Sequence, residues 1–198
     1  MARRSDHTRE ELREMALQAG YDIVRTDGTQ ALTTRAVASR IGYSPGTLYL
    51  IFKNIDHLKF ELNARTLAAM RRRLAEAIAE ISGAEEKLWC MGTIYLDFAL
   101  GSPDLWRLMF EHQMPGDEPL PKSITDQTDA LLVTVTSLFA EIIPADSELD
   151  AANVAAAFWS APHGITHLVI TKKLGLAHVE SAHAVLDTQM RMFLAGVK

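Results

Sequence analysis

LTTRAVASRIGYSPGTLYLIF, residues 32–52, decides the fold of this chain, because it predicts two short helices joined by a tight turn. Thr33 is placed to cap the first helix, and Gly42 supplies the left-handed conformation at which that helix can end. Ser44 followed by Pro45 predicts the start of the second helix, since proline at the first helical position loses no hydrogen bond. The stretch therefore predicts a helix-turn-helix.

The apolar residues of this stretch recur at four-residue spacing, which indicates one buried face on each helix. Val37 and Ile41 mark that face in the first helix, and Leu48 and Phe52 mark it in the second. The residues turned outward at the start of the second helix are small or hydroxylated, which suits the major groove of DNA, about 12 Å wide. A helical hairpin that binds no DNA can show the same caps and spacing, so the pattern alone leaves both interpretations open.

The longer stretch from Thr8 to Leu58 resembles the DNA-binding domain of the TetR/AcrR family of bacterial transcriptional regulators. The matching positions are ordered and correctly spaced: Ala16, Gly28, Leu32, Thr33, Arg35, Val37, Ala38, Ile41, Gly42, Ser44, Gly46, Thr47, Leu48, Tyr49, Phe52, Lys53 and Leu58. The resemblance implies an all-α fold of about nine helices. It places a three-helix, helix-turn-helix DNA-binding domain in residues 1–55 and an effector-binding and dimerisation bundle in residues 56–198.

Two positions depart from the family pattern. The family usually has histidine where this chain has Ile51, just before Phe52 of the second helix, and lysine where it has Ile55. That lysine would place its ammonium against a DNA phosphate, so the resemblance implies one phosphate contact fewer per subunit.

Composition excludes several other classes of protein. The 198 residues are 48% hydrophobic and 23% charged, as in ordinary globular proteins. No apolar run reaches the roughly 18 residues of a membrane span, and the first residues lack the apolar core of a signal peptide. The single cysteine, Cys90, has no partner for an internal disulfide. We therefore expect a cytoplasmic protein with no membrane partner.

The net charge of −5 is unusual for a DNA-binding protein, but its distribution is informative. Residues 1–60 contain nine Lys and Arg against seven Asp and Glu, whereas the rest of the chain contains eleven against eighteen. The N-terminal part, which we call the head, is therefore mildly basic, and the remainder of the chain is acidic. This distribution agrees with DNA contact at one end of the chain only.

Helical periodicity dominates the remainder of the chain. Thr8 and Glu11 form a capping-box pattern, and Ser147 is placed to cap a helix near the C-terminus. The segment 114–123, with three prolines and a glycine, is the clearest loop. We expect helices over approximately residues 9–25, 56–81, 84–100, 103–113, 124–143, 147–173 and 177–195, in addition to the two of the helix-turn-helix.

No motif for catalysis is present. The sequence has no nucleophile elbow, glycine-rich phosphate loop or zinc signature, so we expect neither an enzyme nor a cofactor. His163 and His167 lie four apart, as a metal pair would, but a metal site needs three or four ligands and no further ligand has a suitable spacing. We expect packed or hydrogen-bonded histidines and no metal. An enzyme with a helical body would require titratable groups converging around this pair.

Trp159, His163 and Gly164 are similar in spacing to the tryptophan–histidine–glycine signature of one subgroup of TetR C-terminal domains. The ligands of that subgroup vary, so the similarity implies a type of domain without implying a ligand.

The regions around the fifth, sixth and eighth expected helices are rich in large side chains, several of which carry polar groups. Such a mixture is typical of an apolar ligand pocket with a few orienting hydrogen bonds. We predict an effector site among Trp89, Tyr95, Phe98, Trp106, Met109, Phe110, Gln113, Trp159 and His163.

Together with these observations, the resemblance to the TetR/AcrR family implies a repressor that binds double-stranded DNA at a palindromic operator as a homodimer and is released by a small hydrophobic effector. Dimerisation is expected through the eighth and ninth helices, because their apolar faces have too little within the same chain to cover. These faces include Val169, Ala184, Leu186, Met190 and Phe193. The alternative is an architectural DNA-binding protein without an effector, which a fully packed C-terminal core would favour.

The expected DNA contacts divide by type. Ser44, Pro45, Gly46, Thr47 and Leu50 are placed for base edges and phosphates, and Thr33, Thr34, Arg35, Tyr49 and Lys53 for the backbone. Arg3 and Arg4 precede the first helix and could form a minor-groove arm.

Overall fold

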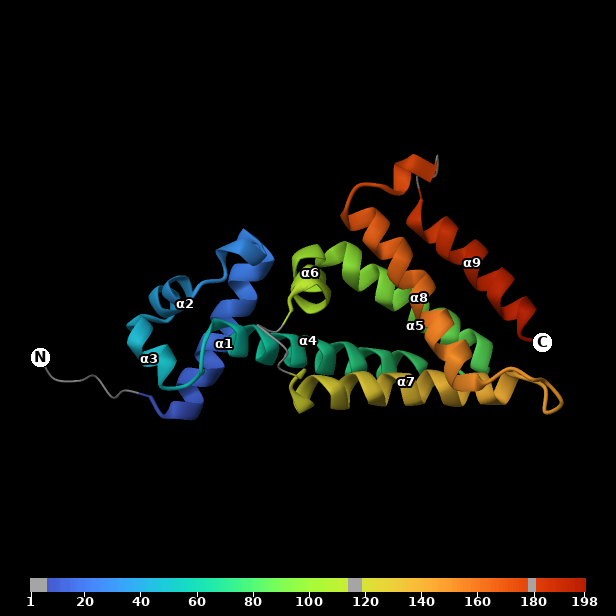
Figure 1. Cartoon of the computed structure of the whole chain (residues 1–198), viewed down its shortest axis with the longest axis horizontal. Coiled ribbons are helices and arrows are strands. Elements are labelled where there is room, and N and C mark those ends of the chain that lie inside the picture. The colour runs from blue at the N-terminus through green and yellow to red at the C-terminus, as the bar shows by residue number, and fades with distance from the viewer. Residues whose placement is uncertain (1–6, 114–118, 178–180) are drawn as a thin grey trace, which may run out of the picture. The chain divides into compact units, whose positions relative to one another are not determined.

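The computed structural model describes residues 7–113, 119–177 and 181–198, and within these ranges it contains nine α-helices, two 3-10 helices and no strand (Figure 1). The predicted all-α class with about nine helices is confirmed. Arg3, Arg4 and residues 114–118 of the expected loop lie outside the described residues. No helix in the described ranges is long and apolar enough to span a bilayer.

The chain packs into two compact units. The first comprises residues 1–66 and 104–124, and the second comprises residues 67–103 and 125–198. Helix α4 (Ile55–Ile78) therefore contributes to both units, and α6 (Pro103–Glu111) contributes mainly to the first. The compact units place the start of α4 and most of α6 together with the three N-terminal helices. The boundary between a DNA-binding domain (residues 1–55) and an effector-binding domain (residues 56–198) therefore stays a prediction.

Three helices begin the first unit: α1 (Arg9–Asp27), α2 (Thr34–Ile41) and α3 (Pro45–Tyr49). The predicted capping box of α1 is confirmed, since the Thr8 hydroxyl accepts from Glu11 N at 3.2 Å and the Glu11 carboxylate accepts from Thr8 N at 2.6 Å. Helix α1 packs on α2, and α2 packs on α3. Their apolar faces form one core with the start of α4, including Ala16, Leu17, Val24, Val37, Ala38, Leu48, Phe52 and Leu58.

Polar contacts attach α6 to the first half of α4. The buried Asn63 side chain donates to the Leu108 carbonyl at 2.9 Å. At the end of α6, His112 Nε2 lies 3.1 Å from Asp56 Oδ1, and the His112 ring contacts the tilted ring of Phe60 with 5.0 Å between centroids. These contacts turn His112 toward α4.

The second unit is built around α5 (Ala84–Gly101), α7 (Lys122–Ile142), α8 (Ala151–Ile170) and α9 (Ala182–Gly196). Helix α5 packs on both α8 and α9, as Figure 1 shows. Phe139, Phe158 and Phe193 meet edge to face at centroid distances of 5.3 to 5.9 Å. Phe139 and Phe158 are buried in this core, and Phe193 is half-exposed at its edge.

The prediction that the apolar residues of the last helix have too little to cover is wrong for two of them. Leu186 and Met190 are buried within their own chain, and both lie close to Gly92 of α5. The absence of a side chain at Gly92 lets α5 approach α9 closely enough to cover them.

Two predicted helix starts are also wrong. Helix α8 begins at Ala151 because Asp150, whose carboxylate accepts from Asn153 N at 2.9 Å, is its cap, whereas the Ser147 hydroxyl accepts from Leu149 N in the preceding turn. Helix α9 begins at Ala182 after a Ser181 cap, because residues 174–177 form a separate 3-10 helix.

Candidate functional site

The turn between α2 and α3 has the predicted chemistry. The Thr33 hydroxyl accepts from Ala36 N at 3.1 Å, and Gly42 ends α2 in the left-handed region, with φ 76° and ψ 25°. Ser44 caps α3 by accepting from Thr47 N at 3.3 Å, and Pro45 occupies the first helical position. A residue with a side chain would be strained at φ 76°, whereas glycine adopts this conformation readily. Gly42 therefore allows the turn that leads the chain into α3.

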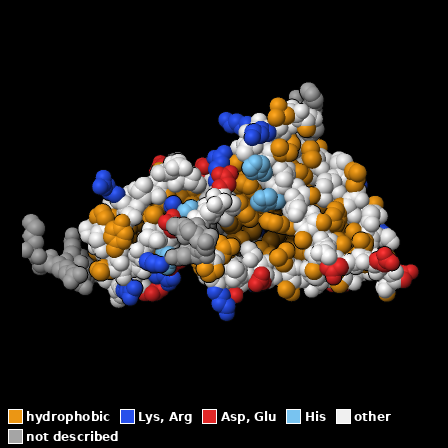
Figure 2. All heavy atoms as spheres, in the orientation of Figure 1, with side chains coloured by type: hydrophobic (Ala, Val, Ile, Leu, Met, Phe, Trp, Pro, Cys, Tyr) orange, Lys and Arg blue, Asp and Glu red, His pale blue; other side chains and the backbone are white. Residues whose placement is uncertain are grey.

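Helix α3 presents one apolar face to the core and another to the outside. Leu48 is only 2% exposed, whereas Tyr49 and Leu50 are 58% and 60% exposed. A Cβ atom added at Gly46 would meet only the Ser44 hydroxyl, at 3.6 Å. The outward surface of α3 therefore combines bare backbone at Gly46 with large side chains one turn later. In Figure 2, hydrophobic side chains are visible over the part of the head where Figure 1 places α2 and α3.

The structure brings the predicted DNA-contact residues together around this turn. Thr34 and Thr47 are half-buried, and Thr34 and Tyr49 both border a small hollow above Leu58. The other eight predicted residues are exposed: Thr33, Arg35, Ser44, Pro45, Gly46, Tyr49, Leu50 and Lys53.

Several basic side chains of the head form ion pairs within the first unit. Arg13 Nε lies 2.9 Å from the Glu61 carboxylate, and Arg40 lies 3.4 Å from that of Asp27. Lys59 pairs with Asp56, and Arg65 pairs with Glu14. Glu14, Asp27 and Asp56 are already counted in the charge balance of residues 1–60, so these pairs leave the basic excess unchanged but place four basic side chains against carboxylates.

Tyr43 is a residue of the turn that the sequence analysis did not single out. Its hydroxyl forms a hydrogen bond of 2.7 Å with His7 Nδ1, which ties the start of the described chain to the end of α2. The two residues are 36 positions apart, so no local pattern in the sequence could have revealed the contact.

The nine predicted effector residues divide between the two units. Trp106, Met109, Phe110 and Gln113 belong to the first unit, and Trp89, Tyr95, Phe98, Trp159 and His163 belong to the second.

Within the second unit, Tyr95 and His163 are joined by a hydrogen bond of 2.8 Å, and the Trp159 ring lies 4.9 Å from that of His163. Trp89 is covered instead by the Arg191 guanidinium, 5.4 Å from its ring centroid.

In the first unit, Trp106 and Phe110 are in ring contact at 5.0 Å, and Trp106 is only 1% exposed. Trp106 is therefore a core residue in this structure, whereas Gln113 is exposed.

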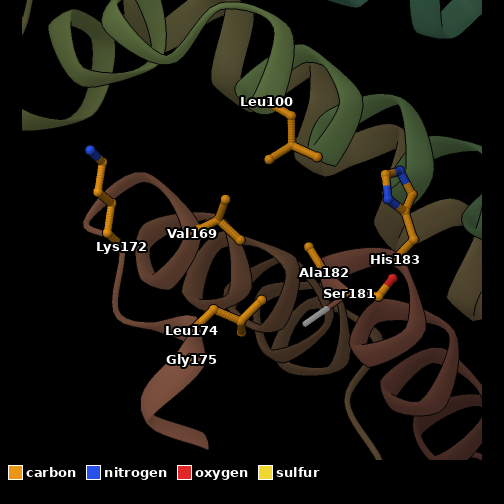
Figure 3. Close-up of a pocket in the computed structure, with 8 residues that line it drawn as sticks. All are labelled: Leu100, Val169, Lys172, Leu174, Gly175, Ser181, Ala182 and His183. Carbon is orange, nitrogen blue, oxygen red and sulfur yellow. The ribbon is translucent and has the colours of Figure 1, made fainter. Parts of the chain in front are cut away.

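Two open grooves are formed by described residues of the second unit. One, of about 600 Å³, lies where α5 and α8 end and α9 begins, and Figure 3 shows Leu100, Val169 and Leu174 bordering it beside Lys172 and His183. The other, of about 640 Å³, lies between the start of α8 and the end of α9. None of the nine predicted effector residues lines either groove. The sequence offered no signal for these grooves, because they form only where separate helices meet.

Burial lowers the pKa of two half-buried histidines, His163 and His112. The pKa of His163 is lowered, first by its removal from water and then by the charge of His167. The pKa of His112 is lowered by burial and by Lys59, and the opposing effect of Asp56 is smaller. In the described parts of the chain, no group of three or more His, Cys, Asp and Glu side chains is arranged to hold a metal ion.

Comparison with known proteins assigns the class. Residues 16–62 match the model of the tetR family of bacterial regulatory proteins, and residues 88–193 match that of the tetracyclin repressor-like C-terminal domain. The chain therefore belongs to the TetR family of DNA-binding transcriptional regulators. The assignment to the tryptophan–histidine–glycine subgroup stays a prediction.

Individual relatives agree with this family. The chain is 24% identical over 186 residues to an uncharacterized HTH-type transcriptional regulator, YobS, of Bacillus subtilis, covering 93% of this chain and 91% of that protein. A protein of unknown function from Rhodococcus sp. RHA1 shares the fold with a TM-score of 0.79 at 21% identity, over 99% of both chains. The regulator FadR of Bacillus subtilis, solved with stearoyl-CoA, has a TM-score of 0.73 at 17% identity, over 93% of this chain and 99% of its own.

The lowered pKa of His163 predicts that stability falls as the solution is acidified. The unfolded chain binds the proton near the ordinary histidine pKa of about 6.5, before the folded chain does, so the free energy of unfolding decreases as pH falls through about 6.5. Urea unfolding at pH 7.5 and 5.5 measures this decrease. His163→Gln should show a smaller decrease than wild type, and an equal one would show that His163 does not contribute.

Proposed function

We propose that this regulator is a repressor that binds a palindromic operator as a homodimer and is released by a small hydrophobic effector. The observation that carries the DNA-binding part is the outward face of α3, with bare backbone at Gly46 and exposed Tyr49 and Leu50. Such a face can enter a major groove without displacing any core residue. The flanking Thr33, Arg35 and Lys53 are exposed and would contact the phosphate backbone.

The exposed faces of α8 and α9 support the homodimer. Ala156, Ser160 and Gly164 follow one another at four-residue spacing on α8, and all three are exposed. On α9, Met192 is 73% exposed. Small residues let a second helix approach closely, and covering the exposed apolar side chains stabilises association. One recognition helix reads only a few base pairs, so a palindrome read by two heads supplies the specificity.

The effector part rests on the second unit. The Tyr95–His163 hydrogen bond, with Trp159 beside it, combines aromatic surface with polar groups. The fold is also shared with FadR of Bacillus subtilis, which was solved with stearoyl-CoA. A ligand with a long apolar part and one or two hydrogen-bonding groups suits such surroundings. The ligand would release DNA if it binds more tightly to a conformer of the protein that does not fit the operator than to the conformer that does.

Gly46→Ala tests the DNA-binding face separately from stability. The new methyl group meets only the Ser44 hydroxyl, and alanine in a helix is favoured over glycine by roughly 0.5–1 kcal/mol, so the melting temperature should not fall. Affinity for duplexes that the full-length protein selects from a random pool should drop at least about tenfold, because the methyl group prevents close approach of the helix to the groove. Gly101→Ala, on α5 with open space around it, is the matched control and should bind as wild type. Equal affinities for the two variants would remove α3 from the interface.

Gly164→Arg tests the proposed dimer face. Apart from its two neighbours and the backbone of its own helix, nothing lies within 4 Å of a Cβ atom added there, so the subunit should keep its helical spectrum. The long charged side chain prevents a second α8 from approaching. Sedimentation should show monomers, and operator binding should be lost. Ser137→Arg, at an exposed position of α7, is the control and should remain dimeric. A Gly164→Arg dimer would place the interface elsewhere.

A thermal-shift screen of apolar compounds, with long-chain acyl-CoA included, tests the effector. A ligand that binds only the folded chain raises the melting temperature, and we expect at least one that also releases DNA. Tyr95→Phe should reduce its stabilisation, and Tyr43→Phe, which removes a hydroxyl in the head, should not. If no compound stabilises the protein, or if stabilisation occurs without DNA release, the architectural alternative is favoured.

A further inference from the structure

The geometry of α3 determines which side chains face away from the core. Successive residues of an α-helix are rotated by about 100°, so the residues two before and two after a buried position point away from it. Leu48 is the buried position, and the corresponding residues are therefore Gly46 and Leu50. Leu50 continues in right-handed helical geometry, with φ −77° and ψ −18°, so the same rotation applies to it.

The chemistry of this segment is unusually restricted. Residues 44–50, SPGTLYL, include no arginine, lysine, asparagine, glutamine, aspartate or glutamate. The Ser44 hydroxyl already accepts from Thr47 N and lies 3.2 Å from the Thr47 hydroxyl, so the two are engaged with each other at the helix start. Bidentate recognition of guanine needs arginine or lysine, and that of adenine needs asparagine or glutamine. None of these side chains is available on α3.

An apolar side chain can still distinguish bases in the major groove. The only apolar group that a base pair presents there is the C5-methyl group of thymine. Leu50 is 60% exposed, and it projects from the same face as Gly46, where only backbone would separate the helix from the DNA. A leucine at this position would contact a methyl group and exclude water from it.

We propose that Leu50 is a specificity-determining residue that recognises a thymine methyl group in each operator half-site. This inference rests on the proposed operator binding, and it specifies the chemistry that the operator must offer to α3. Cytosine lacks the methyl group and is rejected by the loss of contact, whereas 5-methylcytosine supplies it and is accepted.

Replacement of thymine by uracil isolates the methyl group, because the two bases differ in nothing else. Duplexes selected by the full-length protein from a random pool are resynthesised with uracil at one half-site thymine at a time. At one or two positions, wild-type affinity should fall about three- to fivefold, the effect of one buried methyl group. Leu50→Ala should bind the thymine duplex more weakly and should bind thymine and uracil duplexes equally at those positions.

Two controls strengthen the comparison. Leu132→Ala, at an exposed leucine of α7, should retain the wild-type preference for thymine over uracil. A duplex with cytosine at the sensitive position should regain affinity for wild type, but not for Leu50→Ala, when that cytosine carries a 5-methyl group. Circular dichroism should show both variants folded, since both leucines are exposed.

The outcomes that overturn the inference differ from those that overturn the proposed function. If the pool yields an operator but no thymine is sensitive to uracil, or if Leu50→Ala keeps the wild-type ratio, the thymine recognition is wrong and operator binding stands. If the pool yields no enriched sequence, operator binding itself is wrong and the inference fails with it.

Discussion

The burial of Leu48 is the interaction on which the recognition surface depends. Helix α3 has five residues, far fewer than the roughly 12 to 15 that an isolated helix needs to persist in water. It is therefore held by its surroundings, with Leu48 and Phe52 almost completely removed from solvent among the residues of α1, α2 and α4. The outward face of α3 can then vary in chemistry, because none of its residues is needed to keep the helix folded.

Local signals in the sequence predicted most of the head. The caps at Thr8, Thr33 and Ser44 depend on residues three positions apart, and the left-handed Gly42 depends on its own backbone, so these features can be recognised without tertiary structure. The family resemblance extended this reasoning to the whole fold. The starts of α8 and α9 were predicted wrongly because Asp150 and Ser147 offer equivalent capping chemistry, and because the 3-10 helix at residues 174–177 has no distinct periodicity.

Features that join distant parts of the chain could not be predicted in this way. The Asn63–Leu108 and His7–Tyr43 hydrogen bonds connect positions 45 and 36 residues apart, and neither has a pattern of spacing. The same holds for Leu186 and Met190, because an apolar helical face is equally suited to a core and to a dimer interface until its neighbours are known. Gly92, which allows α5 to cover them, is an unremarkable glycine in the sequence. The predicted effector residues could not be grouped into a site for the same reason. Their spacing predicted which aromatic side chains share a helix, but it did not predict which helices would pack around them.

The ion pairs of the head have a consequence for the thermodynamics of DNA binding. A basic side chain that neutralises a phosphate releases a condensed counterion, and this release makes affinity depend on salt. Arg13, Arg40, Lys59 and Arg65 are already paired with carboxylates, so a phosphate would have to replace an existing partner rather than a shell of water. Few ions are then liberated at these four residues. The dependence of DNA affinity on ionic strength should accordingly be smaller than the number of Lys and Arg residues in the first unit would give.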